Sequence, residues 1–337
     1  MLVKEELEKY DSKLMHQTYD NWPEIAFDSF FSNHKPLSQN FVNEIVFVGM
    51  GGSGAINECF AAILSKTNIH VSIVKGYHLP KTVDKNTLMV FTSVSGNTIE
   101  TLSVLDLALK TNCKIIGFSS GGKLEEKCKE NNLEYRKIPM SNSPRASFSA
   151  YFYSMLKVLE NFLPIEKQDI TESIETLKKI RDNIFSKNLN DENVSLKLAE
   201  WINEIPMIYY PWGLQIAAIR FKNSLQENAK MHAMTEDILE TSHNGIVCWE
   251  KDTPIKPILI QGKDDFIKTK ERWKVVKEYF DQNGIDFFEI YSEKGSIITK
   301  LICLIFILDY ASIYRAVLSQ IEPTPVKSID FIKSKIS

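Results

Sequence analysis

The chain has 337 residues, of which 44% are hydrophobic and 25% are charged, and its formal net charge is -3 at pH 7. This length allows two domains, each with its own core. A charge so close to neutral offers no basic surface for nucleic acid. The most apolar stretch, residues 301–308, is far shorter than the ~20 residues that cross a bilayer, so we expect a buried helix and no membrane partner.

The cysteines and the N-terminal residues favour a cytoplasmic protein. The five cysteines are odd in number and have no C-x-x-C spacing, which argues against a disulfide framework and against a zinc site. The first residues are charged and lack the apolar segment of a secretory signal. We therefore expect a reduced, cytoplasmic environment and no metal site.

Strand and helix patterns alternate along the first half of the chain. Residues 1–40 look helical with an interruption at Pro23, and we expect them to form an arm that lies on the first domain. The predicted strands that follow are 44–48, 71–74, 87–92 and 114–118, and the predicted helices are 58–64, 101–110 and 124–130. Such alternation predicts a parallel sheet with helices on both faces.

The same pattern returns in the second half. Residues 146–187 have helical periodicity and would connect the halves. Beyond them the predicted strands are 205–210, 257–261 and 286–291, and the predicted helices are 214–226, 268–283 and 297–319. We predict an α/β protein with two doubly wound parallel-sheet domains, each in three α/β/α layers, related by an internal duplication. The ligand is expected in the crevice between them, at the carboxyl ends of the strands.

Two turns rich in small and hydroxylated residues each follow a predicted buried strand and precede a helix. They read GMGGSG at residues 49–54 and SVSGNT at residues 93–98. Backbone N–H groups at a helix N-terminus and hydroxyl groups both donate hydrogen bonds to oxyanions. The candidate binding residues are Gly51, Gly52, Ser53, Ser93, Ser95 and Thr98. Together the turns indicate a phosphorylated small molecule as the ligand.

The first turn also satisfies the dinucleotide pattern G-x-G-x-x-G, through Gly49, Gly51 and Gly54. In that pattern an acidic residue at the end of the next strand binds the ribose, but this chain has Lys75 there. A lysine favours a 2′-phosphate, so an NADP-dependent oxidoreductase stays open as an alternative. So does a purely structural role, in which the glycines only allow tight packing of strand and helix.

Five further motifs narrow the prediction. They are YDSKLMHQTYDNWP near the start, SPRASF at 143–148, LQENAKMHA at 225–233, ETSHNGIVCWE at 240–250, and a C-terminal segment that begins DYASIYR at residue 309. With the two turns, these motifs resemble the bifunctional phosphoglucose/phosphomannose isomerases, a family with two sugar isomerase (SIS) domains. The resemblance covers nearly the whole chain. The predicted parts are an N-terminal helical arm (1–40), a first SIS domain (41–150), connecting helices (151–195) and a second SIS domain with a C-terminal tail (196–337).

The resemblance implies a reaction, a site and an assembly. The family interconverts glucose 6-phosphate or mannose 6-phosphate with fructose 6-phosphate without a metal or organic cofactor, so a hexose 6-phosphate is the implied partner. By resemblance Glu227 is the catalytic base, His243 opens the sugar ring, and Arg145 and Lys333 are further catalytic residues. The serines and the threonine of the two turns fall on the phosphate-binding positions of the family. The family's histidine is contributed across a dimer interface, which implies a homodimer.

The residue types suit this chemistry. Moving a carbonyl between C1 and C2 through an enediol needs a group that removes a proton from one carbon and returns it to the other, and a single carboxylate can do both. Histidine titrates near neutral pH and can shuttle the proton of ring opening, with His232 as the rival of His243. An arginine stabilises the negative charge of an enediolate.

Several assignments stay open. A non-catalytic phosphosugar sensor would keep the two turns but would need no carboxylate at Glu227. The chain reads DILETSHN, without the proline that the family usually has before the glutamate, and this leaves the role of Glu240 open. Thr324 is a candidate hydrogen-bond partner near the C2–C3 bond of the sugar.

Overall fold

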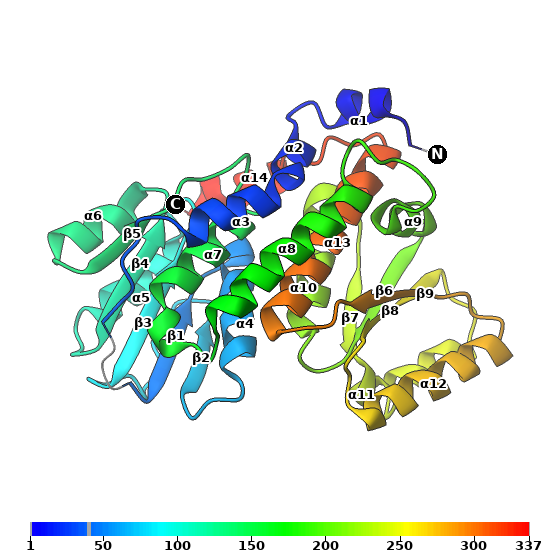
Figure 1. The fold of residues 1–337 in the computed structure, drawn as a ribbon. Helices are drawn as coiled ribbons and strands as arrows, with labels where there is room; N and C mark the ends of the chain where they lie inside the picture. The colour runs from blue at the N-terminus through cyan, green and yellow to red at the C-terminus, as the bar shows by residue number, and fades with distance from the viewer. Residues whose placement is uncertain (1, 39–41, 337) are drawn as a thin grey trace. The chain divides into compact units, whose positions relative to one another are not determined.

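The computed structural model describes residues 2–38 and 42–336, in two compact units (Figure 1). Unit 1 comprises Met1–Asp20 and Gln168–Lys327, and unit 2 comprises Asn21–Lys167 and Ser328–Ser337. These units divide the chain differently from the predicted domains, because both ends of the chain pack with distant segments. The predicted boundary between residues 40 and 41 lies outside the described residues.

Unit 2 is built on a parallel sheet with the strand order β2-β1-β3-β4-β5. Its strands are β1 (Glu44–Val48), β2 (His70–Val74), β3 (Thr87–Thr92), β4 (Lys114–Ser119) and β5 (Glu134–Lys137). Every residue of β1 and β3 is buried, as expected for central strands covered on both faces. The helices are α3 (Trp22–Phe30), α4 (Gly51–Leu64), α5 (Ile99–Ala108), α6 (Gly122–Glu130), α7 (Phe148–Val158), η1 (Glu160–Phe162) and α14 (Lys327–Ile336).

Alternation of side chains along the strands separates two cores in unit 2. Val46 of β1 packs with Leu105 of α5 and Leu124 of α6 on one face. The next residue, Phe47, stacks on Phe60 of α4 on the other face. Successive side chains of a strand point to opposite faces, so this sheet is the middle of three layers.

Unit 1 repeats this plan with one strand fewer. Its parallel sheet has the order β7-β6-β8-β9. The strands are β6 (Ile205–Tyr210), β7 (Met234–Asp237), β8 (Ile255–Gly262) and β9 (Phe288–Ser292). The helices are α1 (Lys4–Tyr10), α2 (Met15–Asp20), α8 (Lys167–Ile184), α9 (Val194–Trp201), α10 (Gln215–Asn228), α11 (Ile238–Thr241), η2 (Gly245–Glu250), α12 (Ile267–Gln282) and α13 (Ile297–Leu318). The order β7-β6-β8-β9 corresponds strand for strand to β2-β1-β3-β4 of unit 2, and only the edge strand β5 has no counterpart. This match confirms the predicted duplication.

Helix α13 forms the core of unit 1. Among the described residues it is the one helix long and apolar enough to cross a membrane, but 89% of its most apolar window is buried inside the protein, as in a core helix. Its Asp309 forms a buried ion pair with Arg220 of α10, with 2.6 Å between Nη2 and Oδ2. The hydroxyl groups of Tyr19 and Ser224 donate to the same carboxylate at 3.0 and 2.8 Å. A buried charge needs such partners, and these tie α2 and α10 to α13.

The first helices of the chain divide between the units. Helices α1 and α2 belong to unit 1, where Tyr19 contacts α13, whereas α3 belongs to unit 2, where Trp22 stacks on Phe148 of α7. Residues 2–38 are therefore not one arm on the first domain, because their apolar side chains enter two different cores. Pro23 does not interrupt a helix either, since it lies in the first turn of α3. A helix has no intrahelical partner for that N–H, and proline lacks it.

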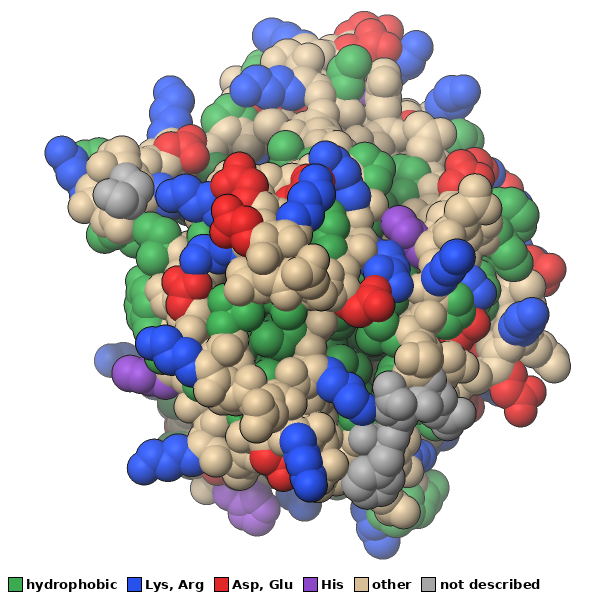
Figure 2. Space-filling view, turned by 90° about the vertical axis from the view of Figure 1, so that its left-hand side faces the viewer, with side chains coloured by type: hydrophobic (Ala, Val, Ile, Leu, Met, Phe, Trp, Pro, Cys, Tyr) green, Lys and Arg blue, Asp and Glu red, His purple; other side chains and the backbone are tan. Residues whose placement is uncertain are grey.

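Side chains of both charge signs occur on the face of the molecule shown in Figure 2. Asp and Glu side chains lie mainly in the upper half of this view, whereas Lys and Arg side chains are spread over all of it.

Candidate active site

The two predicted anion-binding turns meet at the carboxyl edge of the unit 2 sheet. The first joins β1 to α4 and the second joins β3 to α5, and β1 and β3 are neighbouring parallel strands. A direct hydrogen bond links the turns, since the Val94 N–H donates to Ser53 Oγ at 3.3 Å. No side chain caps the first turn of either helix, so the N-terminal N–H groups of both are not taken up by capping side chains. This edge has the donors that an oxyanion requires.

The predicted hydroxyl residues differ in exposure. Ser53 and Ser93 are buried, Thr98 is half-buried and Ser95 is exposed. The hydroxyl groups of Ser93 and Thr98 lie 2.9 Å apart and share a hydrogen bond. Ser95 Oγ accepts from the backbone N–H of Asn97. Ser95 is therefore open to a ligand, whereas Ser93 supports the turn from within.

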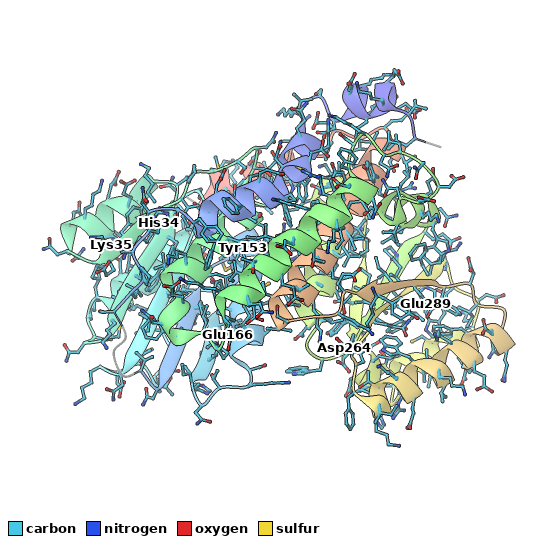
Figure 3. The ribbon with its side chains drawn as sticks, in the orientation of Figure 1. His34, Lys35, Tyr153, Glu166, Asp264 and Glu289 are labelled. Carbon is cyan, nitrogen blue, oxygen red and sulfur yellow. The ribbon has the colours of Figure 1, made fainter. Side chains whose placement is uncertain are left out.

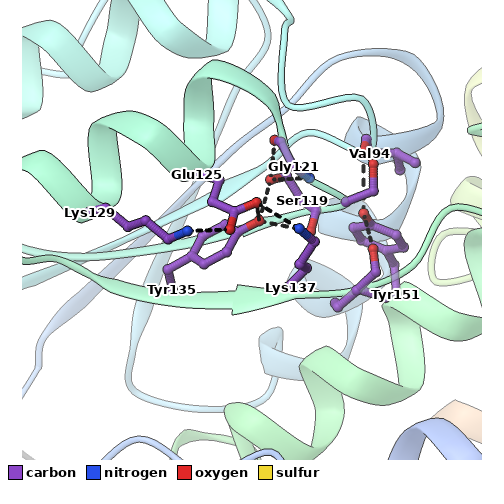
Figure 4. Close-up of polar contacts among 10 residues, drawn as sticks. Val94, Ser119, Gly121, Glu125, Lys129, Tyr135, Lys137 and Tyr151 are labelled. Atoms are coloured by element: carbon purple, nitrogen blue, oxygen red, sulfur yellow. Dashed lines mark hydrogen bonds and ion pairs between the residues drawn. The ribbon is translucent and has the colours of Figure 1, made fainter.

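A polar network holds the second turn in place (Figure 4). The carbonyl of Val94 accepts hydrogen bonds from Ser120 Oγ at 2.7 Å and from the Tyr151 hydroxyl at 3.4 Å. The Tyr135 hydroxyl and Ser119 Oγ lie 2.8 Å apart, next to Glu125 of α6. Burial raises the pKa of Tyr135 to about 12 and raises the pKa of Tyr151 as well. Both phenols are therefore neutral hydrogen-bonding groups at physiological pH.

Gly96 allows the second turn to approach the start of α6. A Cβ atom at this position would lie 1.7 Å from the carbonyl oxygen of Gly121, and the backbone φ of Gly96 is +71°. Both facts exclude other residues without a movement of the backbone. The turn therefore depends on glycine for its geometry.

Arg145 lies beside the first turn. A Cβ atom at Gly52 would be 3.5 Å from Arg145 Cα, which places the SPRASF segment against GMGGSG. Arg145 is buried, so it is not the solvated arginine of a helix start. Two hydrogen bonds shape its loop, from Ser147 Oγ to the Ser143 carbonyl at 2.9 Å and from the Ala146 N–H to Ser143 Oγ at 3.3 Å. Unit 2 thus brings all predicted phosphate-binding residues and Arg145 to one edge.

Two lysines behave differently from this group. Lys75, the residue on which an NADP site would depend, forms an ion pair with Glu58 of α4. Lys333 is exposed on α14, which buries none of its side chains. In the described part of the chain, no hydrogen bond or ion pair joins the Lys333 side chain to the turns.

Glu227 belongs to unit 1 and lies in the last turn of α10, rather than beyond the helix as predicted. Its side chain is half-buried. Two hydrogen bonds fix this turn on α13: Ser224 Oγ donates to Asp309 Oδ1, and Asn228 Nδ2 donates to Ser312 Oγ, each at 2.8 Å. The position of the Glu227 backbone is therefore set by the core of unit 1.

Lys230 completes the end of α10. Its backbone is in the left-handed region, with φ of +57°, and its ammonium donates to the carbonyl groups of Glu227 and Pro323. Thr324 follows in the same segment, and its N–H donates to Glu322 Oε1 at 3.2 Å. The sequence contained this lysine within LQENAK, but only the fold shows that it ties the Glu227 turn to the EPTP segment.

His243 is exposed in the turn between α11 and η2 of unit 1. Its N–H donates to the Glu240 carbonyl at 2.9 Å, and Asn244 Nδ2 donates to Glu240 Oε1 at 2.8 Å. Glu240 therefore braces the histidine turn. The missing proline also has a consequence here, since the N–H of Leu239 donates to Asp237 Oδ1 at 2.8 Å, a bond that proline cannot form.

The described residues contain no group of three or more His, Cys, Asp or Glu that could hold a metal ion.

Comparisons with known proteins point to one family. A profile described as "Bacterial phospho-glucose isomerase C-terminal SIS domain" matches residues 191–336, and a profile described as "SIS domain" matches residues 42–151. A bifunctional phosphoglucose/phosphomannose isomerase of Caldicellulosiruptor bescii is 32% identical over 308 residues, which cover 88% of this chain and 90% of the relative.

Solved structures share the fold. A hypothetical protein from Thermus thermophilus has a TM-score of 0.75 at 13% identity, with 98% of this chain and 92% of that chain covered. Tagatose-6-phosphate ketose/aldose isomerase from Escherichia coli has a TM-score of 0.64 at 15% identity, with 96% and 94% covered. The predicted pair of SIS domains is confirmed.

Proposed function

Since the chain belongs to the family of bifunctional phosphoglucose/phosphomannose isomerases, we propose that it interconverts glucose 6-phosphate and mannose 6-phosphate with fructose 6-phosphate. The observation that carries this proposal is the contact between the two anion-binding turns, from the Val94 N–H to Ser53 Oγ, with Arg145 beside them. Two uncapped helix N-termini at one edge suit a phosphate group better than a neutral sugar hydroxyl.

Glu227 is the proposed base. It removes the proton on C2 of the open-chain aldose while the C1 oxygen gains a proton, which gives the enediol. The protonated Glu227 then returns its proton to C1, and the O2 hydroxyl loses its proton to leave the ketone. Glucose and mannose phosphates differ only at C2 and share this enediol, so one carboxylate serves both. The fixed last turn of α10 supports this role, because proton transfer needs a carboxylate held in position.

The other predicted residues have supporting roles in the proposal. Arg145 stabilises the negative charge that develops on the enediolate oxygens. His243 moves the proton of ring opening, and its exposed turn suits a histidine that a homodimer supplies to the partner subunit's site. Lys333 assists in ring opening. We also propose a cytoplasmic location.

The decisive experiment compares the wild type with Glu227→Gln. Fructose 6-phosphate is supplied in D2O with a chelator, and NMR identifies the aldose that forms and the deuterium at C1 and C2. The wild type is expected to form glucose and mannose 6-phosphates, and deuterium at C2 would reveal exchange at the enediol. Glu227→Gln should bind fructose 6-phosphate normally and turn over ~10²- to 10⁴-fold more slowly.

Glu278→Gln, at an exposed carboxylate of α12, is the matched control and should keep full activity. Near-native turnover by Glu227→Gln would disprove the assigned base. A wild type that binds fructose 6-phosphate tightly but forms no aldose would instead establish the phosphosugar sensor.

A further inference from the structure

Unit 1 contains a cavity of about 380 Å³ that lies outside the residues discussed so far. It lies at the carboxyl ends of β8 and β9, beside α12, and Gln261, Trp273 and Tyr291 form part of its wall. Five lysines line the rest: Lys263, Lys270, Lys274, Lys277 and Lys294. A cavity of this volume is within the range of small-molecule sites.

The cavity exists because unit 1 lacks two elements of the repeated plan. In unit 2, α6 packs on the α5 side of β4 and β5 pairs with the edge of β4, and Glu125 of α6 accepts from Lys129 and Lys137 there (Figure 4). In unit 1 the chain runs from β9 directly into α13, which lies with α10 on the other face of the sheet from α12 (Figure 1). The α12 side of β9 therefore stays uncovered, and Tyr291 is 40% exposed there.

Three of the five lysines have no carboxylate partner among the described residues: Lys270, Lys274 and Lys294. The first two are four residues apart on α12, and like charges at that spacing destabilise a helix. Lys294 comes from a different element, the segment after β9. All three side chains are exposed, and they bring cationic groups from two separate elements to one cavity.

The acidic groups near the cavity are already bound. Glu289 of β9 accepts from Lys277 at 2.7 Å, from Gln261 at 2.6 Å and from Tyr291 at 2.8 Å (Glu289 is labelled in Figure 3). Glu293 pairs with Lys263 at 2.8 Å.

Other carboxylates beside the cavity have partners as well. Asp265 accepts from the Gly262 N–H and from Trp273 Nε1, Asp264 pairs with Lys300, and Glu271 pairs with Lys268. The unbalanced charge of the cavity is therefore positive.

We propose that this cavity binds a small anion with two or more linked phosphate groups, at a site separate from the two turns of unit 2. Lysine is a compact point charge that suits phosphate oxygens, whereas a planar carboxylate favours the paired donors of arginine, and no arginine lines this cavity. Three unpaired ammonium groups match the charge of a diphosphate better than that of one phosphate. This proposal does not depend on the isomerase reaction.

The test is isothermal titration calorimetry of the full chain with inorganic phosphate, pyrophosphate and ATP. Pyrophosphate and ATP should bind at least about tenfold more tightly than phosphate, and more weakly as salt rises. Saturating fructose 6-phosphate should leave this binding unchanged. Tighter binding of ATP than of pyrophosphate would show that the wall formed by Tyr291 and Trp273 contributes, and equal affinities would show that the linked phosphates suffice.

Paired variants make the result specific. Lys270→Gln with Lys274→Gln should weaken pyrophosphate binding at least about tenfold and leave fructose 6-phosphate turnover unchanged. Lys197→Gln with Lys251→Gln removes the same charge from exposed positions of unit 1 outside the cavity and should have no effect. Absence of pyrophosphate and ATP binding, an equal loss in both double variants, or displacement by fructose 6-phosphate would each overturn the proposal.

Discussion

The buried ion pair of unit 1 makes a quantitative prediction for Asp309→Asn. The carboxylate is fully buried and accepts two hydrogen bonds from Arg220, one from Tyr19 and one from Ser224. The amide keeps the volume but removes the negative charge that faces the guanidinium of Arg220, which is only 3% exposed. Breaking one side of a buried pair costs ~3–5 kcal/mol. For a domain of this size, that loss lowers the melting temperature by about 6–20 °C.

The assay is urea unfolding followed by circular dichroism, with scanning calorimetry to resolve the transition of unit 1. Asp182→Asn is the control, because its carboxylate is 65% exposed and pairs with Arg181 at the surface, so it should cost less than about 1 kcal/mol. The double variant Arg220→Met with Asp309→Leu should regain most of the stability, since two apolar side chains leave no buried charge. A loss below about 1 kcal/mol for Asp309→Asn would refute the reasoning.

Two further predictions concern the second turn and the lysine cavity. Gly96→Ala forces the second turn away from the Gly121 carbonyl, so it should weaken fructose 6-phosphate binding at least about tenfold by calorimetry. The unfolding of unit 1 should not change. Unchanged affinity would contradict the assignment of this turn to phosphate binding. Burial alone raises the pKa of Glu289, but hydrogen bonds from Lys277, Gln261 and Tyr291 outweigh it and lower the pKa below 4.5. The stabilisation by the ionised Glu289 is therefore present above pH 4.5 and is lost as the pH falls through the folded-state pKa. The urea midpoints of the wild type and of Glu289→Gln should accordingly converge in acid. A constant difference between the two midpoints from pH 7 down to about pH 3 would argue against the pairing.

The central strands were predictable because burial on both faces leaves a continuous apolar run. The bounds of β1, β3 and β6 are those that the sequence predicts. The strands β5 and β7 were missed, since EYRK and MTED are short edge segments without an apolar period. Such strands form because a neighbouring strand offers hydrogen bonds, which the local sequence does not record.

The candidate site likewise has some features that the local sequence predicts and others that only long-range contacts determine. Local composition sufficed for the two turns, because small residues at a strand–helix junction leave few alternatives. The contact of Arg145 with Gly52 and the bond from Tyr151 to Val94 could not be read from the sequence, since each joins segments that only the fold brings together. The roles of Glu227 and His243 came from the resemblance to the family, and they stay predictions.

The discontinuous make-up of unit 1 has a consequence for biosynthesis. Tyr19 binds Asp309, so the first helices find their place only after the ribosome has translated most of the polypeptide. The sheet of unit 2 is complete once residue 167 has emerged, and it can acquire structure while translation continues. At the usual ~5–20 residues per second, the ribosome synthesises α13 on the order of ten seconds after the sheet of unit 2. During this interval the amphipathic N-terminal segment has no α13 to pack on, and a nascent-chain chaperone can bind its apolar side chains.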